Sequence, residues 1–103
     1  MRKADVFMHD VRAGVLEELS PRTTFRFTYD PAYNGPPVSL TAAVRPEPYT
    51  YETFPPFLEG LLPEGYNLEA LLRAMKIDRQ DLLSQLLAVG GDMVGAVTVR
   101  EIE

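Results

Sequence analysis

The chain has 103 residues, of which 46% are hydrophobic and 24% charged. This composition is typical of a globular domain and excludes a disordered or fibrous protein, so we expect a single domain over residues 1–103. It has no cysteine, which excludes disulfides and thiolate metal sites and makes the cytoplasm the expected compartment. The net charge of -5 disfavours direct contact with nucleic acid, and no apolar run approaches the roughly 20 residues that a membrane span needs.

The first part of the chain alternates between apolar and polar residues, as half-buried β-strands do. Lys3–His9, Ala13–Leu19 and Thr23–Tyr29 have this period of two, and Asp10–Gly14 between the first two has the composition of a hairpin turn. The sequence therefore predicts an antiparallel meander. Ala96–Ile102 alternates in the same way and is predicted to be a closing strand.

The stretch from Asp30 to Pro56 is dense in prolines, which prevents a long helix and favours extended segments. Its tyrosines, leucine and phenylalanine make it too apolar for a flexible linker. We therefore expect it to be ordered and packed over the sheet, with a short strand at Val38–Val44.

Two helices are predicted on either side of Pro63. Pro55 and Pro56 open a short first helix, which Pro63 ends. Asn67 is the expected N-cap of the second helix. Apolar residues then recur at the i, i+3, i+4, i+7 spacing of one buried helix face, and these are Leu68, Leu71, Leu72 and Met75.

Asp78 is predicted to cap a third helix, whose inward side is formed by Leu82, Leu83, Leu86 and Leu87. Gly90 and Gly91 supply the expected stop. The predicted fold class is therefore α+β, a small antiparallel sheet made of a meander plus a C-terminal strand, packed with about three short helices in the second half.

The residues that could carry chemistry do not form a pattern. His9 is the only histidine, so a metal site would depend on carboxylates alone. Glu17 and Glu18 are adjacent on a strand, point to opposite faces and are expected to be solvated. The glycine-rich segment 90–96 follows a helix, whereas a phosphate loop leads into one. We expect no catalytic, cofactor-binding or metal-binding residue, and a domain that is not an enzyme.

Tyr66 is a large aromatic residue in the predicted turn between the first two helices. It precedes the expected cap Asn67, so its side chain can fold back on Leu71 as a hydrophobic staple. It can also project outward, since tyrosine is a preferred anchor in protein interfaces. The residues alone leave both alternatives open.

Four stretches, in this order, resemble the N-terminal subdomain of HipA-type serine/threonine kinases, the toxins of type II toxin–antitoxin modules: "FTYDPAY", "VSLTAAVRPEPY", "FPPFLEGLLPEGYNLEALLR" and "DLLSQLLAVGGDMVGAVTV". The chain ends before the ATP loop and catalytic aspartate of such kinases, so no catalytic residue is carried over. As a free-standing copy it resembles the HipS-like antitoxins of tripartite HipBST systems.

The resemblance implies partners and a site. The expected partners are a HipT-like serine/threonine kinase, which the protein would bind and inhibit, and a HipB-like DNA-binding protein in the same complex. The expected kinase-facing loop is Glu64, Gly65, Tyr66 and Asn67. The alternatives are a non-inhibitory structural subunit that completes the kinase fold, an excised N-terminal domain of a HipA-type kinase, and a chain that contributes to operator binding only through the complex.

Overall fold

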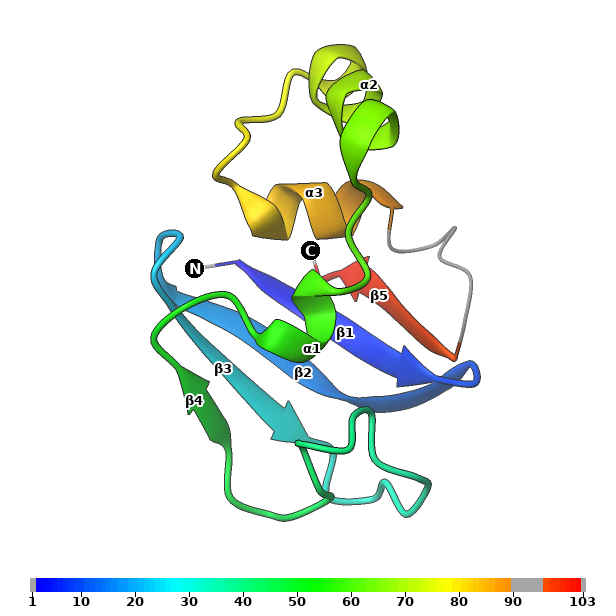
Figure 1. Cartoon of the computed structure of the whole chain (residues 1–103). Coiled ribbons are helices and arrows are strands. Elements are labelled where there is room, and N and C mark those ends of the chain that lie inside the picture. Colours follow the sequence, from blue (N-terminus) through cyan, green and yellow to red (C-terminus); the bar gives the residue numbers. More distant parts are fainter. Residues whose placement is uncertain (1, 90–95, 103) are drawn as a thin grey trace.

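The alternating segments form an antiparallel sheet, as the sequence predicts. In the computed structural model, which describes residues 2–89 and 96–102, the meander comprises β1 (Lys3–Met8), β2 (Val11–Ser20) and β3 (Thr24–Tyr29) (Figure 1). The closing strand β5 (Val97–Glu101) pairs with β1, and β4 (Tyr49–Tyr51) pairs with β3. The strand order β4-β3-β2-β1-β5, with three helices in the second half, confirms the α+β fold.

The turn between β1 and β2 is shorter than predicted. His9 and Asp10 both have positive φ, 50° and 66°, as the two central residues of a tight hairpin turn require. Gly14 therefore does not belong to the turn but lies inside β2. A Cβ atom at Gly14 would lie 2.3 Å from the main-chain oxygen of Thr28, so the close approach of β3 requires glycine there.

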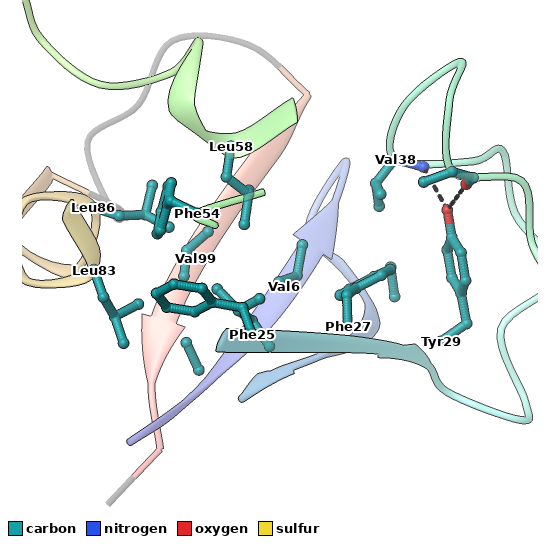
Figure 2. Close-up of a cluster of buried hydrophobic side chains, with 14 of the residues drawn as sticks. Val6, Phe25, Phe27, Tyr29, Val38, Phe54, Leu58, Leu83, Leu86 and Val99 are labelled. Atoms are coloured by element: carbon teal, nitrogen blue, oxygen red, sulfur yellow. Dashed lines mark hydrogen bonds between the residues drawn. The ribbon is translucent and has the colours of Figure 1, made fainter. Parts of the chain in front are cut away.

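The proline-rich segment is packed against the sheet, but the predicted strand at Val38–Val44 is wrong. It contains one isolated bridge, Ser39 to Ala42, and the strand of this region is β4. The hydroxyl of Tyr29 accepts a hydrogen bond from the Val38 N–H at 3.0 Å and donates one to the Ala42 carbonyl (Figure 2). These main-chain groups are thus bonded to a side chain and not to a neighbouring strand.

The hydrophobic core lies between one face of the sheet and the helices α1 (Pro56–Glu59) and α3 (Leu82–Val89) (Figures 1 and 2). The ring of Phe25 meets that of Phe54 edge to face, with 5.3 Å between centroids. Side chains from both layers are fully or almost fully buried in it, among them Val6, Phe25, Phe27, Leu58, Leu83, Leu86 and Val99. Leu83 and Leu86 confirm the predicted inner face of the third helix.

The cap of α3 is one turn later than predicted. Asp81, and not Asp78, accepts hydrogen bonds from the main-chain N–H of Ser84 at 3.3 Å and from its hydroxyl at 2.7 Å. Asp78 instead forms a local turn, accepting the N–H of Gln80 at 2.8 Å. The predicted stop at Gly90 and Gly91 lies outside the described residues.

The second helix, α2 (Gly65–Met75), lies beyond α3 on the side away from the sheet (Figure 1). α3 is the element with which it has its main contact. None of its residues is buried, and Met75 is 57% exposed. The prediction of a buried face was therefore wrong for α2, although the helix itself was predicted. Its periodicity marks an apolar side, which α3 covers only partly.

Candidate partner-binding site

The sheet carboxylates Glu17 and Glu18 are each engaged in ion pairs of the fold. Among residues 2–89 and 96–102 no group of three or more histidine and acidic side chains could hold a metal ion. None of the described helices is long and apolar enough to cross a membrane. Glu17 pairs with Arg26 at 3.0 Å on the outer face of the sheet. Glu18 is 6% exposed, so the prediction of a solvated side chain was wrong for it.

Glu18 belongs to an ion-pair cluster that joins the sheet to α3. Its two carboxylate oxygens accept hydrogen bonds from Arg2 at 2.9 and 2.8 Å. The same guanidinium donates to Asp81 at 2.9 Å and to Ser84 at 2.7 Å. The hydrogen bond from Arg2 lowers the pKa of Glu18 and exceeds the opposite effect of burial. The cluster therefore fixes α3, and so indirectly the base of α2.

The loop expected to face a partner forms the start of α2. Glu64 is the N-cap residue but makes no side-chain capping bond, and Gly65, the first helical residue, has a φ of +59°. Only glycine adopts this backbone conformation without strain. Asn67 is the third residue of the helix, so its prediction as the cap was wrong. The helix begins three residues earlier than predicted because Gly65 can make the sharp entry.

The earlier helix start determines where Tyr66 points. With about 100° per residue, Tyr66 lies about 200° around the helix axis from Leu68 and about 140° from Leu71. Its side chain therefore leaves the helix on the side opposite the apolar residues. It is 95% exposed, which excludes both a staple on Leu71 and a core contact. The structure does bring the four expected loop residues together, all exposed, at the end of α2 nearest α1.

Two further features of this region were not predicted. Arg79, in the connection from α2 to α3, forms an ion pair with Glu69 of α2. The amide of Gln85, which is 1% exposed, donates to the main-chain oxygen of Arg79 at 2.8 Å. Gln85 thus anchors this connection to α3, and Arg79 ties it to α2. A glutamine among the leucines of α3 was the available signal.

The arrangement suits recognition of another protein. It presents an exposed aromatic side chain on a helix end. The carboxylates of Glu59 and Glu64 are exposed, and neither has an ion-pair partner within the described part of the chain. The loop can therefore offer apolar contact and negative charge together.

Comparisons with known proteins agree with the resemblance seen in the sequence. A family model described as the HipA N-terminal domain matches residues 4–100. An uncharacterized protein of Haemophilus influenzae (strain ATCC 51907 / DSM 11121 / KW20 / Rd) is 33% identical over 101 residues, which are 98% of this chain and 93% of that protein. A solved structure titled "N-terminal domain of HipA toxin" is 32% identical and superposes with a TM-score of 0.79, covering 100% of this chain and 94% of the other.

Proposed function

The chain belongs to the HipA N-terminal domain family, and on that premise we propose that it is a cytoplasmic antitoxin without enzymatic activity, which binds and inhibits a HipT-like serine/threonine kinase. The observation that carries the proposal is the exposure of Tyr66, at 95%, on the first turn of a helix that extends away from the core. An exposed aromatic side chain held on a regular element is a typical anchor of a protein interface.

Tyr66 would act by entering the active-site cleft of the kinase and blocking substrate or closure of the cleft. Its ring brings a large apolar area with few rotamers to lose, and its hydroxyl can keep a hydrogen bond in the bound state. The unusual φ of Gly65 and the ion pair of Arg79 with Glu69 fix the main chain that carries Tyr66 before binding. Preorganisation of this kind lowers the entropic cost of association.

The Haemophilus influenzae relative supports a role as a separate protein. The matched region makes up 93% of that relative, so the domain there is not followed by a kinase domain of any size. We propose the same organisation here, with a HipB-like DNA-binding protein as the third member of the complex. The net charge of -5 favours contact with DNA through that member and not through this chain.

The proposal is tested by co-expression with a HipT-like serine/threonine kinase, followed by a kinase assay and a growth assay. We expect Tyr66→Ala to weaken binding by about 30-fold, or about 2 kcal/mol, and to abolish rescue of growth. Leu40→Ala is the matched control, because Leu40 is also fully exposed, at 101%, but lies in the proline-rich segment. Undiminished neutralisation by the Tyr66 variant would refute the anchor role.

The second candidate is a subunit that completes the kinase fold without inhibiting it. The partly uncovered apolar side of α2 favours it, since such a surface is covered when a larger fold is assembled. The same kinase assay separates the two functions. An inhibitor lowers the activity of the purified kinase in proportion to the complex formed, whereas a completing subunit raises it.

A further inference from the structure

Two hollows lie side by side at the base of α2. The larger, of about 320 Å³, is bordered by Tyr66 and the Glu69–Arg79 ion pair. The smaller, of about 160 Å³, lies toward α1. Leu68 and Arg79 line both hollows, so the two form one continuous groove. We call it the α2 groove and define it by Leu62, Leu68, Arg79 and Leu82.

The lining of the α2 groove favours an apolar occupant. Leu62, Leu68 and Leu82 are each only half-buried, so their exposed surface would gain from being covered. The polar groups beside them already have partners, Arg79 with Glu69 and the amide of Gln85 with the Arg79 carbonyl. A side chain that enters would therefore need to satisfy no buried donor or acceptor.

One end of the groove is acidic. Glu59 and Glu64 both line the smaller hollow, both are exposed, and neither forms an ion pair with any residue in the ranges 2–89 and 96–102. The cation nearest in the groove, Arg79, is already bound to Glu69. Two unneutralised carboxylates beside an apolar floor complement a lysine or arginine that follows an apolar side chain.

We propose that the α2 groove receives a segment of the partner kinase in which an apolar side chain has a lysine or arginine beside it. This inference rests on the proposed function. In such an interface each protein inserts a side chain into the other. Tyr66 enters the kinase, and the kinase segment enters the α2 groove beside Tyr66. The groove is continuous with the Tyr66 loop, so one docked partner covers both, and the charge-dependent part of binding belongs to the groove.

The test compares two double variants that change the net charge equally. Glu59→Lys with Glu64→Lys reverses the acidic end of the groove, and Glu47→Lys with Glu52→Lys reverses two exposed acids in the proline-rich segment. Binding to the purified kinase is measured at about 50 and about 300 mM salt. We expect the groove variant to bind at least tenfold more weakly at low salt and to lose most of the salt dependence, and the control to stay within about threefold of the parent.

The outcomes separate this inference from the proposed function. If Tyr66→Ala weakens binding while both charge variants bind like the parent, the function stands and the groove is not a contact. If the parent itself does not bind the kinase, the proposed function fails first. If the isolated protein is a dimer that the groove variant converts to a monomer, the groove receives a second copy and the inference is overturned. Thermal unfolding of each variant confirms that it is folded.

Discussion

The backbone conformation of Gly65 gives the sharpest test of how the Tyr66 loop is built. Replacing Gly65 with alanine forces an L-residue to a φ of +59°. A Cβ atom there would meet no other atom within 4 Å, so the cost is backbone strain alone. That strain is about 1–2 kcal/mol, from which a few tenths are recovered because alanine has less freedom in the unfolded chain. The net loss is about 1 kcal/mol.

Gly60 provides the matched control within the same segment. It also has open space around its Cβ position, but its φ is -64°, which alanine adopts freely. Gly60→Ala should therefore stabilise the fold by about 0.5 kcal/mol through the unfolded state. The two substitutions are chemically identical and differ in the sign of φ, so opposite effects on stability isolate the backbone conformation.

The assay combines thermal unfolding with hydrogen exchange of the α2 amides. For a domain of this size about 1 kcal/mol corresponds to a change in Tm of roughly 4–8 °C, with Gly65→Ala lower and Gly60→Ala slightly higher than the parent. Because α2 packs mainly on α3, part of the Gly65 effect should appear as faster exchange in α2 alone. Gly65→Ala with the stability of the parent, or above it, would refute the left-handed entry to the helix.

Three further predictions concern the rest of the fold. Gly14→Ala should destabilise the protein by roughly 3 kcal/mol, because the added Cβ atom would lie 2.3 Å from a main-chain oxygen of β3. A midpoint of urea unfolding that is unchanged from the parent would contradict this close approach. Tyr29→Phe should lower the free energy of unfolding by about 2–3 kcal/mol, because two buried main-chain groups of the proline-rich segment lose their hydrogen-bond partner. A loss below about 0.5 kcal/mol would argue that water replaces the hydroxyl. Glu18→Gln should cost about 2 kcal/mol at pH 7. Arg2 lowers the pKa of Glu18 in the folded state, so the stabilisation is complete above the ordinary pKa of 4.5 and is lost as the pH falls below it. Urea unfolding should therefore show the stabilities of the parent and the Gln variant converging between pH 7 and pH 3. A difference that stays constant would exclude this titration.

The strands and the third helix could be predicted because their patterns are local. Phe25, Phe27 and Tyr29 alternate with polar residues, and a period of two is itself the geometry of a strand with one buried face. Leu83 and Leu86 recur with the helical period and are buried as expected. The hydrogen bonds of Tyr29 to the proline-rich segment join residues that no local pattern relates, and they replaced the predicted strand.

In the candidate site, too, some features follow from the sequence and others depend on tertiary contacts. The sequence alone determined that an aromatic residue follows a glycine at the break between two helices, and it excluded disulfides and thiolate metal sites through the absence of cysteine. The tertiary structure decided that α2 begins at Gly65, that its apolar side is covered only partly by α3, and that Tyr66 is exposed. Helical periodicity fixes which residues share a face, but whether that face is buried depends on what packs against it. α3 makes that contact, and the position of α3 is set by its packing on the sheet, which no pattern within α2 encodes.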